Sequence, residues 1–378
     1  MLVPKVLLYL ASNSPFYTQL FLQIKEGFEQ AGLEVIGGPN LLQDEELLKL
    51  IEEHKPLFVF EMNRSKNEIK NFPKEVVHVC WLVDFWGRKH HEIEGSDILY
   101  CWSKSWVKAF EDQSANQNVL FLPPATSSKS YYPLAKEKMN DFLFLGHIPN
   151  PWNSDELMRP VGTLNEQEVL FKDLLPLLSS YALNKELNMD CHSYLNEQKI
   201  ILKHPVDKVI EYDISSRTQR QIRREAFVKL FLKKEFSLSI FGSKNWLNYE
   251  HFKKFYKGYI EEPSKINEEL AKTNILLHDG NYPHFRTFDA MAAKCCVAAC
   301  ETPSSHKNSW LDLDFKEDED YLKVEFFSQK VDFNKFKNKK LLTDIAYNAY
   351  NKVKKSHLWV HRAETILLDI EKLRSSNV

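Results

Sequence analysis

Short apolar runs alternate with segments of helical period through the first third of the chain. Lys5–Leu10 (KVLLYL) and Leu57–Met62 (LFVFEM) have the length and continuity of buried strands, whereas Thr18–Gly32 repeats apolar residues every four positions and stops at a glycine. Further strands are expected at Leu33–Ile36, Val76–Val83, Asp97–Trp102 and Val119–Leu122, and further helices at Asp44–His54 and Ser105–Asp112. Continuous apolar strands separated by helices are typical of a parallel sheet covered on both faces. Residues 1–125 are therefore predicted to form a Rossmann-like domain.

A segment rich in proline and serine follows this alternation. Pro123–Pro133 (PPATSSKSYYP) has neither a helical nor a strand period and is expected to link two domains. The second domain opens with a strand and a glycine turn at Asp141–Gly146, and residues 150–235 have the pattern of loop and helix, which predicts a helical insertion. The helices expected there are Glu166–Tyr181, kinked or split by Pro176, and Arg217–Lys234, with its arginines on the solvent side.

The alternation of strand and helix resumes after the insertion. The expected elements are strand Phe236–Gly242, strand Phe255–Ile260, helix Ser264–Lys272, strand Asn274–His278, helix Pro283–Ala293, strand Cys295–Cys300 and a short strand near Tyr321–Val324. This pattern predicts a second Rossmann-like domain over residues 134–340, and Leu341–Arg374 is expected to be one long helix or two. Ligands of open α/β sheets bind at the carboxyl ends of the strands, so the cleft between the domains is the expected site.

Composition narrows the classes of function. The chain has 378 residues, 43% of them hydrophobic, which is enough for two domain cores. Its net charge is −2 and both signs are mixed along the chain, so neither a long nucleic acid nor an anionic membrane is an expected partner. The N-terminal apolar run is too short to span a membrane and lacks the basic residues and cleavage site of a signal peptide. A cytoplasmic protein is expected.

Cysteine and histidine spacing does not predict a metal site. None of the six cysteines forms a C-x-x-C pair and most lie in apolar runs, so buried free thiols are expected. His90 and His91 are adjacent and would point to opposite faces of a strand, with no third ligand evident. We predict no metal and no cofactor.

The stretch Asn281–Cys300 carries the clearest chemistry. The helix expected there has Arg286 in its first turn and Asp289 one turn later. The guanidinium and the free N–H groups of the helix N-terminus could both meet a diphosphate, and the carboxylate could accept hydrogen bonds from ribose hydroxyls, with the small Ala293 leaving room. An arginine and an aspartate three residues apart more often form a surface ion pair. The neighbouring face, expected to be core, consists of Phe285, Phe288 and Ala292.

This stretch also resembles a known family. The run PHFRTFDAMAAKCCVAAC resembles the C-terminal signature of the CgeB-like glycosyltransferases and of the wider group-1 glycosyltransferases. Other segments resemble the family in the same order, namely WLVDFWGR at 81–88, the linker at 123–133, DFLFLGHIPNPW at 141–152, SIFGSKNW at 239–246, KGY at 257–259 and HLWVHRAETIL at 357–367. The resemblance implies a GT-B fold, in which two Rossmann-like domains face a central cleft and the C-terminal segment, here 341–378, crosses back to the first domain.

The resemblance also implies roles by position. Arg286 would contact the donor phosphates and act in catalysis, Asp289 would hold the ribose where the family usually has glutamate, and Thr287 would belong to the same donor site. Two positions depart from the family. Asn281 stands where many group-1 enzymes have an earlier glutamate, which leaves the stereochemical outcome open. Lys294 replaces the glycine that caps the helix, and a solvated lysine is expected there.

The remaining donor-site candidates follow strand ends of the second domain. They are Gly146, His147, Arg159, Lys244, Gly258 and Tyr259. A glycine lets the backbone approach a ligand, a basic side chain could neutralise phosphate, and Gly258 or Tyr259 could meet the base. The ordinary alternatives are a plain turn, a structural histidine and surface charge.

The acceptor candidates follow strand ends of the first domain. Asp84 ends a strongly apolar strand next to Trp86, and an aromatic ring beside a carboxylate is typical of a sugar site. Partial desolvation could make Asp84 a general base, although aspartate is also a common turn residue. Ser12 and Asn13 follow the first strand and are expected to face the same cleft.

These features predict a glycosyltransferase that moves a sugar from a nucleotide-sugar, with a UDP-sugar favoured, to a glycan, protein or small-molecule acceptor. A sugar-nucleotide epimerase or a phosphorylase of the same fold would use the same donor platform. A binding protein without activity is a further alternative, because Asn281, Asp289 and Lys294 depart from the family pattern. A dehydrogenase is disfavoured, since no G-x-G-x-x-G follows an expected strand.

Overall fold

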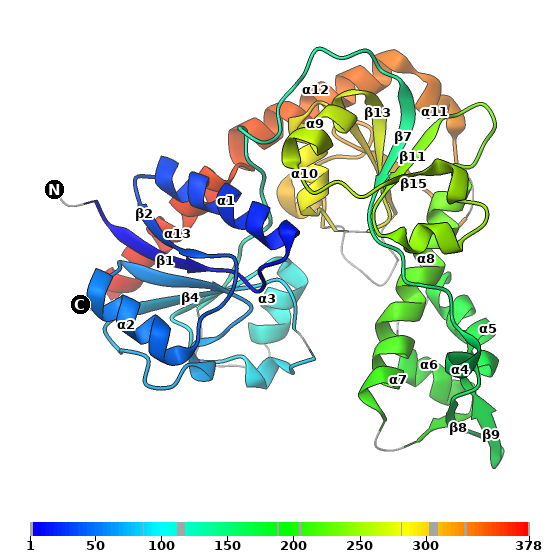
Figure 1. Cartoon of the computed structure of the whole chain (residues 1–378), viewed down its shortest axis with the longest axis horizontal. Coiled ribbons are helices and arrows are strands. Elements are labelled where there is room, and N and C mark those ends of the chain that lie inside the picture. The colour runs from blue at the N-terminus through cyan, green and yellow to red at the C-terminus, as the bar shows by residue number, and fades with distance from the viewer. Residues whose placement is uncertain are drawn as a thin grey trace.

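The computed structural model describes residues 3–85, 87–111, 118–186, 189–203, 206–280, 282–301, 309–328 and 331–376. Two α/β domains lie side by side, and a smaller unit projects from the second of them (Figure 1). The N-terminal sheet is parallel, in the order β2-β1-β3-β4-β5-β6. Its strands are β1 (Lys5–Tyr9), β2 (Glu34–Gly38), β3 (Phe58–Met62), β4 (Val77–Leu82), β5 (Ile98–Cys101) and β6 (Val119–Phe121), and its helices are α1 (Pro15–Gln30), α2 (Asp44–His54) and α3 (Lys104–Glu111).

The C-terminal sheet is also parallel, in the order β12-β11-β7-β13-β14-β15. Its strands are β7 (Asn140–Leu145), β11 (Leu238–Phe241), β12 (Tyr256–Gly258), β13 (Thr273–His278), β14 (Cys296–Cys300) and β15 (Leu322–Val324). The strand order reverses between β7 and β13, and a reversal of this kind opens a crevice at the carboxyl ends of the two strands. The helices outside the insertion are α8 (Thr218–Leu230), α9 (Pro263–Ala271), α10 (Phe285–Ala292), α11 (Phe333–Lys337), α12 (Lys339–Ser356) and α13 (Trp359–Ser376). Both Rossmann-like domains expected from the sequence are thus confirmed.

The sequence had predicted a helical insertion, but the insertion also contains a small sheet. Its three strands form an antiparallel sheet, β10-β8-β9, with β8 (Pro160–Leu164), β9 (Gln167–Leu170) and β10 (Ile200–Leu202), beside α4 (Ser154–Leu157), α5 (Phe171–Ala182), α6 (Cys191–Glu197) and α7 (Lys208–Tyr212). The expected helix Glu166–Tyr181 is wrong in its first turn, which belongs to β9. The expected split is also wrong, because α5 runs through Pro176 to Ala182. The unit has its own apolar core, around Phe171, Leu174 and Leu195.

One helical path connects the insertion to the C-terminal sheet. α7 passes through a π-helical turn, Asp213–Arg217, directly into α8, and the residues at both junctions keep right-handed helical backbone angles. The buried Asp213 accepts a hydrogen bond of 2.5 Å from Arg159 and lies 3.5 Å from the Arg217 guanidinium. The expected helix Arg217–Lys234 is therefore only the second part of a longer path, and it ends at Leu230. Helical π-turns are frequent at functional sites.

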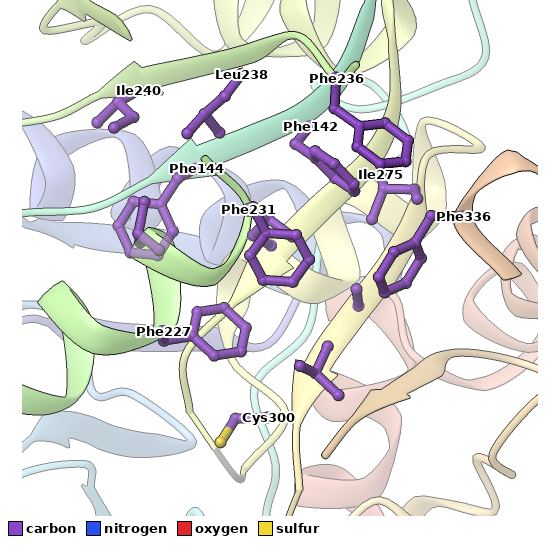
Figure 2. Packing of buried hydrophobic residues seen from close by; sticks show 14 of the residues in the cluster. Phe142, Phe144, Phe227, Phe231, Phe236, Leu238, Ile240, Ile275, Cys300 and Phe336 are labelled. Atoms are coloured by element: carbon purple, nitrogen blue, oxygen red, sulfur yellow. The ribbon is translucent and has the colours of Figure 1, made fainter. Parts of the chain in front are cut away.

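The apolar side of α8 packs on the C-terminal sheet. Phe227 of this helix and Phe231, the residue directly after it, meet Phe142 and Phe144 of β7 in an aromatic cluster (Figure 2). The ring centroids of Phe142 and Phe231 lie 4.9 Å apart at an interplanar angle of 62°, the edge-on arrangement that aromatic pairs prefer. This packing also fixes which way Arg220 and Arg224 point, because they precede Phe227 on the same side of the helix.

The linker and the last helix join the two domains. Residues 123–127 are buried, and Arg362 of α13 donates hydrogen bonds to the carbonyl oxygens of Pro123 (2.9 Å) and Pro124 (3.0 Å). α13 lies beside α1 of the N-terminal domain (Figure 1), and its Asp369 accepts a hydrogen bond of 2.8 Å from Tyr100 Oη of β5. The tail is two helices, the second of the two alternatives expected.

A close crossing of α1 and α13 yields a stability prediction. A Cβ atom on Gly27 of α1 would lie 2.4 Å from the Trp359 Cβ and 2.8 Å from the Val360 nitrogen. Alanine is the better helix former by about 1 kcal/mol, but overpacking costs about 1–3 kcal/mol. The contacts are with the Trp359 Cβ and with backbone atoms, so a net loss of about 2 kcal/mol is expected, and in a chain of 378 residues Gly27→Ala should lower Tm by about 2–3 °C in a calorimetric scan. Gly38→Ala is the control, because a Cβ there meets nothing within 4 Å. A Gly27→Ala protein as stable as the parent would contradict the close crossing.

Candidate functional site

Two cavities meet at Arg286, where the carboxyl ends of β7 and β13 face the N-terminal domain. The first, which we call the Asp289 cavity, has a volume of about 320 Å³, and the second, the arginine cavity, about 350 Å³. Both are lined by Leu145, His284 and Arg286. The Asp289 cavity is further lined by Phe16, Gln19, Gln23, Tyr131, Gly146, His147, Tyr259 and Asp289, among others. The arginine cavity is further lined by Trp102, Ser216, Gln219, Arg220, Arg223, Arg224, His278 and Asp279, among others.

Arg286 stands at the start of α10 and reaches back to β7. Its Nη1 donates a hydrogen bond of 2.6 Å to the carbonyl oxygen of Leu145. Burial lowers the pKa of Arg286, and the nearby Arg224 guanidinium lowers it further. An arginine pKa is so high that the group keeps its charge at neutral pH. The site therefore holds a desolvated cation, which gains much from an anionic ligand.

Asp289 lies one turn further along α10 and is only 9% exposed. Thr126 of the linker donates a hydrogen bond of 2.6 Å from its hydroxyl to Asp289 Oδ1, and the Tyr131 hydroxyl is a second partner. Burial raises the pKa of Asp289 to about 7, although these hydrogen bonds and the Arg286 charge act in the opposite direction. The carboxylate expected to hold ribose is thus tied to the segment that joins the domains.

Arg224 of α8 forms an ion pair across the arginine cavity. Its Nε donates to Asp279 Oδ2 at 2.6 Å, directly after β13, and its Nη1 donates to the carbonyl oxygen of His147. Burial alone would raise the pKa of Asp279, but the Arg224 guanidinium outweighs it and lowers the pKa. Burial lowers the pKa of both His278 and His284, so both rings are neutral at pH 7. The positive charge of the cavity comes from arginines.

Two glycines allow the loops after β7 and β11 to approach each other. A Cβ on Gly242 would lie 1.9 Å from the carbonyl oxygen of Gly146, and a Cβ on Gly146 would lie 2.9 Å from the Phe144 ring and 3.3 Å from Arg286 Nη1. The indole N–H of Trp246 donates to the same Gly146 oxygen at 2.7 Å. A side chain at position 242 would clash with backbone, and one at position 146 would have to displace the Phe144 ring. Gly146 lines the Asp289 cavity.

The donor candidates fall into two groups. Gly146, His147, Tyr259, Arg286 and Asp289 line the Asp289 cavity. The His147 ring is exposed, accepts a hydrogen bond of 3.1 Å from the Ser243 N–H, and lies 5.9 Å from the ring of Tyr259, which is 49% exposed.

Four other donor candidates and Ala293 line neither cavity. Arg159 lies in the insertion, paired with Asp213, and Lys244 is exposed on a 3-10 turn (Lys244–Asn248). Gly258 has a φ of 110°, and its carbonyl accepts the Gly242 N–H at 2.9 Å, which places it behind the cavity. Thr287 is fully buried, and its hydroxyl binds the backbone of His284 at the start of α10.

The residues around the end of α10 also differ from the expectation. Ala293 is 3% exposed and packs in the core, so it does not belong to a ligand-facing side. Lys294 adopts the left-handed conformation, with a φ of 55°, at the position of the family's glycine. Its ammonium lies 5.2 Å and 4.7 Å from the ring centroids of Tyr347 and Tyr350, so it is held by α12 rather than simply solvated. Asn281 lies outside the described residues.

Three of the four acceptor candidates, Ser12, Asn13 and Asp84, line neither cavity. Asp84 is exposed, and its backbone N–H donates to Asn63 Oδ1. Ser12 Oγ accepts a hydrogen bond of 3.3 Å from the Ser14 N–H, and Asn13 is exposed. Trp86 lies outside the described residues. The N-terminal domain instead reaches the cavities through α1, with Phe16, Gln19 and Gln23, and through Trp102 after β5.

Sequence reasoning missed the arginines of α8. The sequence predicted that they face solvent, but Arg220, Arg223 and Arg224 line the arginine cavity. Their spacing of three and four residues places them on one side of a helix, the same side as Phe227 and Phe231, which pack in the core. That pattern and the position of α8 after the first strand of the second domain were the available signals.

The remaining expectations concern cysteines, metals and membranes. All six cysteines are buried and free, as expected. Among the residues that the structure describes, no group of three or more histidine, cysteine, aspartate or glutamate side chains is placed to hold a metal ion. Within those same ranges, none of the helices combines the length and the apolar character that crossing a membrane requires.

Part of the chain, including the C-terminal side of this site, matches a known protein family. Residues 219–368 match the family described as glycosyl transferase-like. The match begins in α8 and ends in α13, so it includes Arg220, Arg224, Arg286 and Asp289 but less than half of the chain. No curated protein matches the chain by sequence.

Solved structures resemble nearly the whole chain. Sucrose-phosphate synthase from Thermosynechococcus elongatus has a TM-score of 0.56 at 10% identity, over 99% of this chain and 100% of that one. An alpha-glucosyltransferase in complex with UDP and a 13-mer DNA has a TM-score of 0.54 at 10% identity, over 97% of this chain and 99% of that one. AviGT4, a glycosyltransferase involved in avilamycin A biosynthesis, has a TM-score of 0.50 at 10% identity, over 98% of each chain. At such low identity the likeness shows the fold, which is GT-B, as the sequence predicted.

Proposed function

We propose that this chain is a glycosyltransferase that takes a sugar from a nucleotide-sugar, with a UDP-sugar favoured, and moves it to an acceptor in the cleft. The observation that carries the proposal is the pair Arg286 and Asp289. They lie on successive turns of α10, at the point where the strand order reverses, and both line one cavity. A desolvated cation next to a buried carboxylate suits a diphosphate next to a ribose.

The donor would lie across the boundary of the two cavities. The nucleoside occupies the Asp289 cavity, with its ribose hydroxyls donating to Asp289 and its base near Tyr259. The diphosphate lies at Arg286, which lines both cavities, and within reach of Arg224. The sugar then extends into the arginine cavity, toward the N-terminal domain.

Catalysis would rest on the charge of the departing diphosphate. As the bond from the sugar carbon to the phosphate oxygen breaks, its electron pair stays on the nucleoside diphosphate, and the acceptor oxygen bonds to the sugar and loses its proton. Arg286 and Arg224 are fixed beforehand, by the Leu145 carbonyl and by Asp279. Preorganised cations of this kind stabilise developing charge without reorganising during the reaction. The start of α8 supplies no free N–H groups, because α8 continues the path of α7.

A thermal-shift panel tests this proposal. The purified chain is heated with UDP, GDP, ADP or dTDP, and with the corresponding nucleotide-sugars. We expect one of the nucleoside diphosphates to raise Tm, because a ligand at one hundred times its Kd stabilises the folded state by about 2.7 kcal/mol. The matching nucleotide-sugar should then be consumed with release of the nucleoside diphosphate.

The same panel separates the alternatives. An epimerase would convert the nucleotide-sugar without releasing the diphosphate, and a phosphorylase would need inorganic phosphate. A binding protein would show the shift in Tm without consumption. If no nucleotide shifts Tm and no nucleotide-sugar is consumed, the proposal is wrong.

A further inference from the structure

The arginine cavity contains more positive charge than a donor diphosphate requires. Among the residues that the structure describes, four arginines and one carboxylate line this cavity, and the carboxylate, Asp279, is paired with Arg224. A nucleotide-sugar brings two negative charges on its diphosphate, so the cavity keeps a positive excess with the donor bound. A charge that the donor leaves unmatched is available to another ligand.

The excess charge is located at Arg220. Arg223 is already held by other parts of the protein, since its Nε donates to the Ala182 carbonyl at 2.8 Å and its guanidinium lies 5.8 Å from the Phe327 ring centroid. The exposed Arg220 instead donates from Nη2 to Tyr212 Oη at 3.1 Å and to Ser216 Oγ at 2.9 Å. Both partners are uncharged, so they orient the guanidinium without neutralising it.

Arg220 is separate from the donor position. It lines the arginine cavity but not the Asp289 cavity, whereas Arg286 lines both. Ser215, Ser216 and Gln219 beside it add neutral hydrogen-bonding groups to the same wall. These groups come from the π-helical turn and the first turn of α8, so the insertion shapes this part of the cavity.

The N-terminal domain supplies an aromatic wall. Trp102 follows β5 directly, lines the arginine cavity, and has its ring centroid 6.1 Å from that of His284. A large ring with an apolar face suits the face of a sugar, and the arginine wall suits a negatively charged group. A ligand that satisfies both has a sugar ring and an oxyanion.

We propose that the arginine cavity binds an acceptor sugar that carries a phosphate or carboxylate group, with Arg220 as the residue that selects the charge and Trp102 as the wall for the ring. The proposal rests on the proposed function, because it takes the donor nucleoside to lie in the Asp289 cavity and the donor diphosphate at Arg286, which leaves the part of the arginine cavity between Arg220 and Trp102 for the acceptor. A planar guanidinium binds either oxyanion through paired N–H groups. The charge on the acceptor, and not its size, would decide binding.

Calorimetric titration tests the proposal. The chain is first saturated with the nucleoside diphosphate that binds in the thermal-shift panel, and is then titrated with glucose 6-phosphate, glucuronate or glucose. We expect at least one of the charged sugars to bind about tenfold or more tightly than glucose. A preference for the phosphate or for the carboxylate would identify the group. Equal affinity for all three sugars, or no binding of any, would overturn the proposal.

Variants locate the effect. Arg220→Ala should remove the preference for the charged sugar, and Arg220→Lys should keep part of it, while the affinity for the nucleoside diphosphate is measured separately in each protein. Lys229→Ala is the matched control, because Lys229 is an exposed cation on the same helix that lies outside the arginine cavity. A preference that survives in Arg220→Ala would refute the assignment.

The two proposals can fail independently. If no nucleotide binds the parent protein, the donor assignment fails, and the charged sugars are then titrated into the protein alone. An Arg220-dependent preference would still be visible there. If the nucleotide binds and the preference is absent, only the acceptor assignment fails.

Discussion

Arg286→Ala is expected to reduce the consumption of the nucleotide-sugar by about 100- to 1,000-fold, the range found when one fixed group that stabilises developing charge is removed. Among the described residues of α10, Arg286 alone lines both cavities. Its removal leaves the departing diphosphate with Arg224 alone, and Asp279 already offsets part of that charge. The loss should appear in kcat as well as in KM.

The measurement is the rate of nucleoside diphosphate release at saturating nucleotide-sugar. Lys244→Ala is the matched control, since this lysine was a phosphate-binding candidate from sequence but is exposed and lines neither cavity. Its rate should equal that of the parent protein. Arg286→Lys separates charge from geometry and should recover only part of the rate. An Arg286→Ala protein that keeps a third of the parent rate would exclude Arg286 from catalysis.

The fold was predictable because its signals are local. Runs such as Lys5–Leu10 and Leu57–Met62 are apolar apart from Lys5 and Glu61, and this pattern is typical of a strand buried on both faces. The observed β1 and β3 differ from these runs by one residue at their ends. The helix that carries Arg286 and Asp289 was expected at Pro283–Ala293 and is observed at Phe285–Ala292. Its bounds were predictable because apolar strands precede and follow it.

The insertion was misread because its turn uses unusual residues. Asn165 and Glu166 connect β8 to β9 with φ angles of 50° and 67°. Asparagine tolerates this left-handed region, whereas glutamate rarely adopts it, so Glu166 was read as the start of a helix. The prediction therefore assigned β9, the second strand of the hairpin, to the helix that in fact begins at Phe171.

The composition of the site could not be predicted because periodicity does not reveal the partner of a helical face. Phe285 shares a face with Phe288, yet it packs against the N-terminal domain, 6.0 Å from Trp81 by ring centroids. The arginines of α8 share a helical face with the buried Phe227, and the pattern does not show that this face runs past the sheet into a cleft. Arg224 and Asp279 are 55 residues apart, so only the assembled sheet brings them together.

Asp289 should make the protein sensitive to pH in two opposite ways. Its pKa is about 7 in the folded protein, against 3.8 for an ordinary aspartate. Between these values the folded protein binds a proton that the unfolded chain does not, so stability falls as pH rises. The contribution is fully present below the unfolded value and is lost as pH rises through about 7, by up to about 1.4 kcal/mol per pH unit. Donor affinity should rise over the upper part of this window, because the ionised carboxylate accepts both ribose hydroxyls.

Asp289→Asn should remove both effects. The amide oxygen can still accept the hydrogen bond from Thr126, so the fold is kept, but nothing titrates and the affinity for the nucleotide-sugar should fall about tenfold or more at pH 8. The measurements are Tm of the free protein from about pH 4 to about pH 8 and calorimetric Kd from about pH 6 to about pH 8, with a nucleotide-sugar whose diphosphate keeps its charge over that range. Asp155→Asn, an exposed aspartate in the first turn of α4, is the control and should keep the parent profiles. If Asp289→Asn also keeps them, the buried carboxylate is not the titrating group, because no other change was made between the two proteins.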